Sequence, residues 1–265
     1  MSTPILMLGA GRMGGAMIEG WLAAGAFDGR ELMVRDPHPG SVAERAARAG
    51  ALVNPPDADL ARASTVVLSV KPQVWRDVAA ETAAWLGSGA VVVSICAGVR
   101  SGDIAKAFGG RPVARVMPTT AAAIGQGTAS LFADDPAARA RARALFEPLG
   151  AVVDLHDESL MHAATAVSGS APAYLYAFIE ALEAAGAAGG LAPEDAKRLA
   201  RSTLTGAAAL LSHTGEDPAE LRRQVTSPGG TTQAALEVLM GEEGLPGLLE
   251  DAVAAAVRRS KELGG

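Results

Sequence analysis

Three glycines near the N-terminus have the spacing of a phosphate-binding loop, directly after an apolar segment and before a helical one. In the G-x-G-x-x-G pattern the first glycine permits a tight turn, and the second lets the backbone approach a pyrophosphate. The third lets the helix pack closely on the strand. The helix N-terminus then offers free N–H groups to the phosphates. The pattern predicts a dinucleotide site, with a glycine turn that holds no ligand as the alternative. The residues of this loop are Gly9, Ala10, Gly11, Arg12, Met13 and Gly14.

The second apolar segment ends in two residues that bear on the choice of nucleotide. Asp36 follows Arg35 in the sequence Val-Arg-Asp-Pro-His. A carboxylate at this point typically binds the ribose hydroxyls of NAD, whereas an arginine suits the 2′-phosphate of NADP. Arg35 can also be read as a solvated surface residue. The motif alone therefore leaves NAD and NADP open.

Two later apolar segments end in residues that we expect at the same crevice. Lys71 and Pro72 follow Val70, and Ala97 and Gly98 close the next such segment. Ligands bind outside the carboxyl ends of the strands in open α/β sheets. We therefore expect Lys71 near a phosphate or ribose, rather than as a solubilising residue at a strand end. The small pair after residue 96 would let a nicotinamide lie close to the backbone.

A second unusual turn interrupts the helical region near the C-terminus. Proline lacks an N–H group and adjacent glycines cost backbone entropy, so such a turn is unfavourable unless it has a use. If a helix begins near Thr231, the turn presents backbone N–H groups that can bind a carboxylate without a basic side chain. The simpler alternative is a helix N-cap. The residues of the turn are Ser227, Pro228, Gly229, Gly230, Thr231 and Thr232.

These residues need a scaffold, and the apolar pattern indicates one. Short, nearly continuous apolar runs alternate with helical stretches, which is typical of parallel strands buried on both faces. The pattern predicts an N-terminal Rossmann-type doubly wound α/β sheet over residues 1–157, followed by an all-α domain over 158–265. The expected strands lie at 4–11, 31–37, 64–72, 90–98, 112–118, 127–133 and 151–155. The expected C-terminal helices span 159–188, 193–213, 218–225, 231–240 and 246–262.

The composition excludes several classes of protein for this chain. The net charge of −6 without a basic block argues against nucleic acid, and the single cysteine, Cys96, excludes an intramolecular disulfide and a multi-cysteine metal site. Neither a signal-like N-terminus nor a membrane-spanning apolar run is recognisable, so we expect a cytoplasmic protein. Aromatic residues make up 4%, so helices packed through small side chains gain less buried area, and oligomerisation is a plausible source of stability.

Six segments in the same order resemble pyrroline-5-carboxylate reductases, over essentially the whole chain. The last two are specific to that family, and the first is shared by many Rossmann proteins. The segments are GAGRMGGAM (9–17), VKPQ (70–73), VVVSICAGV (91–99), RVMPTT (115–120), VSGSAPAYLYAFIEAL (167–182) and VTSPGGTTQAAL (225–236).

The resemblance implies an enzyme that completes proline biosynthesis by reducing a cyclic imine with NADPH, NADH being possible, and a homodimer or higher oligomer formed through the C-terminal helices. By matching positions, residues 9–14 and Arg35 would bind the dinucleotide, and residues 227–232 the substrate. Thr232 would hydrogen-bond the ring nitrogen. The positions implied to line the ribose and nicotinamide are Val70, Lys71, Pro72, Ala97, Gly98, Met117 and Pro118.

Two positions depart from what the family predicts. Thr119 stands where the family usually has asparagine, so a role for this side chain beside the nicotinamide is open. Asp36 would repel a 2′-phosphate, which weakens the expected preference for NADPH.

Two other functions are compatible with parts of the sequence. A β-hydroxyacid dehydrogenase shares the two-domain plan, but those enzymes resemble one another in a Gly-x-x-x-Lys-x-x-x-Asn helix that neither Lys197 nor Lys261 matches. A dinucleotide-binding sensor would not need to keep the Ser-Pro-Gly-Gly-Thr-Thr turn.

Overall fold

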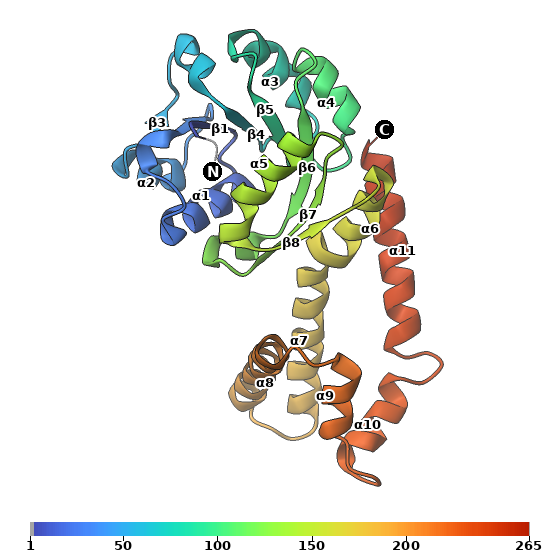
Figure 1. Ribbon diagram of the computed structural model, residues 1–265. Helices are drawn as coiled ribbons and strands as arrows, with labels where there is room; N and C mark the ends of the chain where they lie inside the picture. Colours follow the sequence, from blue (N-terminus) through green and yellow to red (C-terminus); the bar gives the residue numbers. More distant parts are fainter. Residues whose placement is uncertain (1–2, 265) are drawn as a thin grey trace. The chain divides into compact units, whose positions relative to one another are not determined.

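The computed structural model describes residues 3–264, and its contacts divide the chain into two compact units (Figure 1). The sheet unit contains the residues up to Gly169 together with those from Ala256 onward. The helical unit runs from Ser170 to Ala255. The two are described separately below.

An eight-stranded sheet forms the centre of the sheet unit, in the order β3-β2-β1-β4-β5-β6-β7-β8. Neighbouring strands are parallel except for the antiparallel pair β6 and β7. The predicted doubly wound α/β sheet is thereby confirmed, while the two-residue strand β3 was missed because it is too short to form an apolar run. The strands are β1 Ile5–Leu8, β2 Leu32–Arg35, β3 Leu52–Val53, β4 Thr65–Leu68, β5 Val91–Ser94, β6 Val113–Pro118, β7 Gly127–Phe132 and β8 Gly150–Asp154.

Helices cover both faces of this sheet (Figure 1). Alternate residues of β1 point to opposite faces, so Ile5 and Met7 join one apolar cluster while Leu6 and Leu8 join another. The first cluster is covered by α1 (Arg12–Ala24), α2 (Ser41–Arg48) and α5 (Pro136–Phe146). The second is covered by α3 (Trp75–Thr82) and α4 (Ser101–Ala107).

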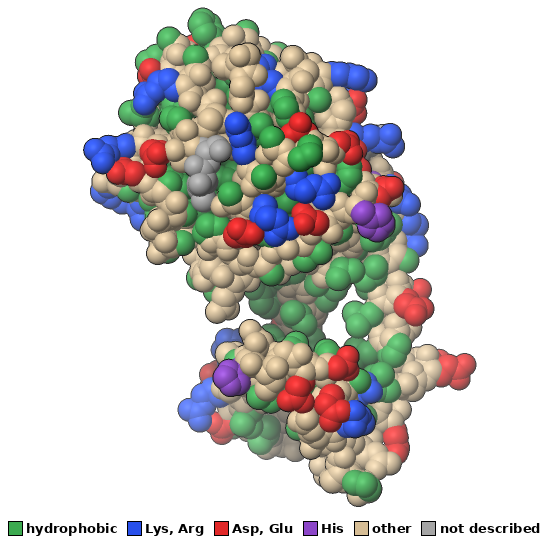
Figure 2. All heavy atoms as spheres, viewed as in Figure 1, with side chains coloured by type: hydrophobic (Ala, Val, Ile, Leu, Met, Phe, Trp, Pro, Cys, Tyr) green, Lys and Arg blue, Asp and Glu red, His purple; other side chains and the backbone are tan. Residues whose placement is uncertain are grey.

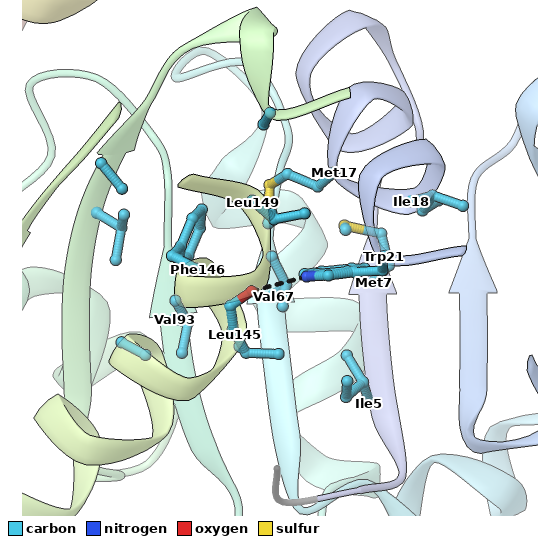
Figure 3. Close-up of a cluster of buried hydrophobic side chains, with 14 of the residues drawn as sticks. Ile5, Met7, Met17, Ile18, Trp21, Val67, Val93, Leu145, Phe146 and Leu149 are labelled. Atoms are coloured by element: carbon cyan, nitrogen blue, oxygen red, sulfur yellow. Dashed lines mark hydrogen bonds between the residues drawn. The ribbon is translucent and has the colours of Figure 1, made fainter. Parts of the chain in front are cut away.

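Trp21 of α1 lies at the centre of the first cluster, with Met17 and Ile18 of the same helix beside it (Figure 3). Its indole Nε1 donates a hydrogen bond to the carbonyl oxygen of Leu145 in α5 at 2.7 Å. A buried indole N–H needs such a partner, because leaving it unpaired would cost its desolvation energy. The bond therefore ties the first helix of the unit to the last one on that face.

The chain passes from the sheet to the helical unit through a widened helical turn. Helix α6 (Met161–Ala164) runs into a π-helical turn over Thr165–Gly169 and then into α7 (Ala171–Ala188). The sequence Ser168-Gly169-Ser170 before Pro172 predicts a capped helix start, which is wrong. Ser168 Oγ instead donates to the carbonyl of Ala164 at 2.8 Å, and Ser170 makes no side-chain cap within the described chain.

The contact boundary at Gly169 differs from the sequence boundary after residue 157. Met161 and Ala166 are buried, and the π-helical turn packs against β6 and β7. Residues 158–169 therefore group with the sheet although they are helical, because the apolar pattern gives the type of an element but not the surface that it packs against.

The helical unit contains α7, α8 (Pro193–Thr214), α9 (Pro218–Gln224), α10 (Thr231–Leu239) and the first part of α11 (Leu245–Gly264). These elements lie where the sequence predicts helices. Gly186 lets α7 and α8 approach, since a Cβ at that position would lie 3.2 Å from the Cβ of Ala196. Among the helices within residues 3–264, none has both the length and the apolar character needed to cross a membrane.

Candidate functional site

The register of three strands brings the predicted nucleotide residues to one edge of the sheet. Leu8 of β1 pairs with Arg35 of β2 and with Leu68 of β4. The residues that follow, Gly9 and Ser69 among them, therefore lie side by side at the carboxyl ends of the strands. This is the edge at which open α/β sheets bind ligands.

The three glycines of the loop differ in whether packing within the chain requires glycine at their position. Gly9 has φ +92°, and a Cβ there would lie 2.6 Å from the carbonyl oxygen of Ser69. A Cβ at Gly14 would lie 2.4 Å from the carbonyl oxygen of Gly9, so both positions exclude a side chain. At Gly11, in contrast, a Cβ would meet no described atom within 4 Å. Packing within the chain does not require glycine there, and the open space above this backbone fits a ligand that approaches it.

A cavity of about 780 Å³ opens beside this loop, at the ends of β1, β2 and β4. Five of the predicted cofactor residues line it: Gly9, Gly11, Arg35, Val70 and Lys71. Ala10 and Arg12 line a second cavity of about 540 Å³, which Gly11 also lines. The other predicted cofactor residues line neither cavity: Met13, Gly14, Pro72, Ala97, Gly98, Met117 and Pro118.

Ser69 is a site residue that the sequence analysis did not select. Its hydroxyl is buried, lines the larger cavity, and has no hydrogen-bond partner among the described residues. A buried hydroxyl without a partner is unfavourable, so it fits a site that a polar ligand or water completes. Together with the open space at Gly11, it indicates that the residues present fit a dinucleotide. The sequence signal that could have identified Ser69 is its position as a polar residue directly after an apolar strand.

Asp36 and Arg35 have partners that the sequence did not reveal. The Asp36 carboxylate accepts hydrogen bonds from the backbone N–H of Ala10 at 2.7 Å and of His38 at 2.8 Å. Oδ2 thus holds the glycine loop to the end of β2, and Oδ1 closes a local turn with His38. Arg35 Nη1 lies 2.6 Å from Asp57 Oδ1 at the cavity wall. The carboxylate that could bind the ribose hydroxyls of NAD therefore has a structural role, and the arginine has an ion-pair partner.

Asn54 fixes the backbone of Asp36 from the adjacent strand. Its Oδ1 accepts from the N–H of Asp36 at 3.0 Å, and its Nδ2 donates to the carbonyl of Asp36 at 2.9 Å. Asn54 has φ +49°, a conformation that asparagine tolerates better than most residues. The Asn-Pro-Pro sequence at 54–56 is typical of a turn, but it does not reveal this contact across the sheet.

The residues expected at the nicotinamide end follow β5 or lie on β6. Gly98, with φ +78°, is buried after β5, and Met117 and Pro118 end the neighbouring strand β6. Thr119 is buried, and its Oγ1 accepts a hydrogen bond from the N–H of Thr128 at 3.0 Å. This threonine hydroxyl therefore holds the connection between β6 and β7.

Cys96 lies beneath the same region. Its thiol is buried and donates to the carbonyl of Val70 at 3.2 Å. Burial raises the pKa of the thiol. Cys96 therefore remains a packed thiol. No group of three or more His, Cys, Asp or Glu side chains arranged for a metal ion occurs in the part of the chain that the structure describes.

In the helical unit, the Ser-Pro-Gly-Gly turn leads directly into α10, which begins at Thr231. The N–H of Gly230 donates to the carbonyl of Ser227 at 3.0 Å, and Gly229 has φ +71°. A Cβ at Gly230 would lie 2.5 Å from Ser227 Oγ and 3.1 Å from the carbonyl oxygen of Ser227, so a side chain there would crowd the turn, while the positive φ of Gly229 favours glycine.

The N-cap alternative for this turn is wrong, because no side chain of the described residues caps α10. Gln233 reaches back to accept from the N–H of Gly229 at 2.7 Å. Within residues 3–264 the hydroxyls of Ser227, Thr231 and Thr232 have no hydrogen-bond partner. Thr232 is half-buried, and the other two are exposed. The turn thus combines uncapped N–H groups of a helix start with three available hydroxyls.

Comparisons with known proteins place the chain in a family. Residues 158–263 match the family described as pyrroline-5-carboxylate reductase dimerisation, and residues 4–98 match the family described as NADP oxidoreductase coenzyme F420-dependent. A pyrroline-5-carboxylate reductase from Synechocystis is 38% identical over 271 residues, which cover 100% of this chain and 99% of that protein.

Solved structures agree with these matches. A pyrroline-5-carboxylate reductase from Coxiella burnetii has a TM-score of 0.91 at 31% identity, with 100% of each chain covered. A pyrroline carboxylate reductase from Plasmodium falciparum, solved with NADP bound, has a TM-score of 0.84 at 26% identity and covers 100% of this chain and 99% of that one. The chain belongs to the pyrroline-5-carboxylate reductase family.

Proposed function

We propose that the protein reduces 1-pyrroline-5-carboxylate to L-proline with NADPH, the last step of proline biosynthesis. The observation that carries this proposal is the match over the whole chain to proteins named pyrroline-5-carboxylate reductase. The nucleotide loop of the sheet unit and the uncapped turn of the helical unit supply the two kinds of site that such a reaction needs.

The substrate carries a carboxylate next to a C=N bond. We assign its carboxylate to the N–H groups at the start of α10, with Ser227, Gly229, Gly230 and Thr231 forming the turn. A helix N-terminus attracts an anion through unpaired N–H groups and the helix dipole. No basic side chain is required at this site.

Thr232 is the residue that we assign to the ring nitrogen. When bound, the reduced nicotinamide supplies a hydride to the imine carbon, and the nitrogen must hold a proton when it becomes an amine. A substrate that arrives as the iminium brings that proton itself. The Thr232 hydroxyl then orients the ring through a hydrogen bond, and orientation and charge placement are the main contributions of the enzyme.

The cofactor site favours NADPH over NADH in this proposal. Arg35 lies at the wall of the larger cavity, where it can contact a 2′-phosphate, and the Asp36 carboxylate is engaged by two backbone donors. The repulsion that Asp36 would exert is thereby reduced, although its charge remains. Asp57 pairs with the same guanidinium and would compete with a 2′-phosphate for it, so we expect NADH to be used as well. Gly9 to Gly14, Val70 to Pro72, Ala97, Gly98, Met117 and Pro118 complete the proposed cofactor contacts.

We further propose that the helical unit forms a homodimer, or a higher oligomer, with a second copy of the chain. Large apolar side chains are exposed on α7, α8, α10 and the first part of α11, and Figure 2 shows hydrophobic side chains in green. The match of residues 158–263 to a dimerisation family supports the same assignment.

The first experiment is to follow NADPH and NADH oxidation at 340 nm with and without 1-pyrroline-5-carboxylate. We expect rapid oxidation that requires the imine and is faster with NADPH. If both cofactors bind but neither is oxidised, the reductase proposal fails and a dinucleotide-binding sensor becomes the better description. A Gly14→Val variant is the matched control for cofactor binding, because its side chain would collide with the carbonyl of Gly9 and distort the glycine loop.

A further inference from the structure

A second group of charged side chains surrounds a cavity of about 440 Å³ in the sheet unit. Arg100, Arg115, His162 and Lys261 line it, with Glu158 as the acidic member. Two arginines and a lysine thus face one carboxylate. None of these five residues belongs to the proposed cofactor or substrate contacts, although Gly98, a proposed cofactor contact, also lines the cavity.

Glu158 is fully engaged within the protein. Its Oε1 accepts from the backbone N–H of Ser101 at 2.7 Å and from Arg115 Nη1 at 2.9 Å. Its Oε2 accepts from the Ser101 hydroxyl at 3.0 Å. Burial raises the pKa of Glu158, but these hydrogen bonds outweigh it and hold the pKa below its ordinary value. This carboxylate therefore balances the buried Arg115 and the start of α4.

Arg100 and Lys261 are the cations that remain. Arg100 lies between β5 and α4, and Lys261 lies in the last part of α11. Both are exposed, and neither has an ion-pair partner among the described residues. His162 Nδ1 lies 2.9 Å from Ser260 Oγ, which joins α6 to the same part of α11. Burial and the nearby Arg115, Lys261 and Arg100 lower the pKa of His162, which favours its neutral form.

We propose that this cavity binds a small oxyanion with two negative charges, such as inorganic phosphate, between the Arg100 guanidinium and the Lys261 ammonium. Two unpaired cations from distant parts of the chain converge there, and a dianion would compensate both. Bound in this way, the anion joins the end of α11 to the loop that carries Ala97 and Gly98.

The test is the melting temperature of the protein with and without 10 mM phosphate, at constant ionic strength and with saturating NADP⁺. The cofactor fills the glycine loop, which would otherwise compete for phosphate. We expect phosphate to raise the melting temperature by about 2–4 °C if its dissociation constant is near 1 mM. The shift should be lost in Arg100→Gln and Lys261→Gln but kept in Lys261→Arg, which retains the charge.

Arg259→Gln is the matched control, because Arg259 lies on the same helix, pairs with Glu262 at 2.8 Å and does not line the cavity. Phosphate also stabilises proteins non-specifically, so the test depends on the difference in the melting-temperature shift between the wild type and the variants. An equal shift in the wild type and Lys261→Gln would overturn the proposal. So would a shift with L-proline but not phosphate that disappears in Arg100→Gln, since the cavity would then bind the carboxylate of the reaction.

Discussion

The two units of the chain differ sharply in how they bury apolar side chains. The sheet unit contains fully buried large residues, including Trp21, Phe108 and Phe146. In the described part of the helical unit, Ala196 and Ala200 are the only buried hydrophobic residues. Its larger side chains, such as Tyr176, are exposed. The sheet unit therefore has a core of its own, whereas the helical unit needs another surface to bury its apolar side chains.

The largest expected effect is on the core of the sheet unit. Trp21→Ala removes a buried indole and its hydrogen bond to Leu145, and we expect it to lower the free energy of unfolding by about 3–5 kcal/mol. Denaturant unfolding followed by circular dichroism measures this. Trp85→Ala is the control, because Trp85 is half exposed and we expect a smaller loss. Equal losses would mean that the core is not centred on Trp21.

The next prediction tests the helical unit through Tyr176, whose side chain is 64% exposed in the single chain. A charge at a protein interface is strongly unfavourable, so Tyr176→Asp should weaken self-association by about 2 kcal/mol or more. Light scattering coupled to gel filtration should show a lower molar mass at the same protein concentration.

Ile124→Asp is the control for that experiment, since Ile124 of the sheet unit is 72% exposed. It should leave the molar mass unchanged. If the wild-type protein is monomeric at micromolar concentration, the proposed dimer is wrong. The helical unit would then not bury its apolar side chains against a second copy.

A third prediction concerns the charge buried in the sheet unit. Glu158→Gln should lower the free energy of unfolding at pH 7 by about 2 kcal/mol, because Arg115 loses its anionic partner. The folded-state pKa of Glu158 lies below the unfolded value, so its stabilisation is present above pH 4.5 and is lost as pH falls below that value. Urea unfolding of both proteins from pH 7 to pH 3 should show the difference shrinking. A constant difference would show that the carboxylate acts by packing alone.

The turn of the helical unit carries the fourth prediction. Thr232→Ala should lower kcat/KM by about ten-fold or more, which corresponds to one well-placed hydrogen bond. Steady-state kinetics with the imine measures it. Thr205→Ala on α8, whose hydroxyl donates to the carbonyl of Arg201, should have no effect. If Thr232→Ala has the same kcat/KM as the wild type, Thr232 has no role in the reaction.

The smallest expected effect is on cofactor choice in the sheet unit. Asp57→Asn removes the carboxylate that pairs with Arg35, so NADPH should bind about two- to five-fold more tightly while NADH is nearly unchanged. Quenching of protein fluorescence gives both dissociation constants. Weaker NADPH binding would mean that Asp57 positions the guanidinium rather than competing for it.

Much of the fold was determined by local sequence. Near-continuous apolar runs predicted seven of the eight strands, and the helical ranges of the second unit were predicted as well. The glycine loop and the turn before α10 were also predicted, because both depend on backbone conformations that only glycine readily adopts. The widened turn at 165–169 was not, since nothing in that short segment separates a π-helical turn from an α-helical one.

Contacts between distant residues were decided only by the tertiary structure. The sequence placed Arg35 beside Asp36 but did not show that Ala10 and His38 engage the carboxylate, or that Asp57 pairs with the arginine. Arg100 and Lys261 are 161 positions apart and meet at one cavity. Hydrogen bonds and charges act over a few ångströms in space, so residues far apart in the chain acquire a shared chemistry only when the fold brings them together.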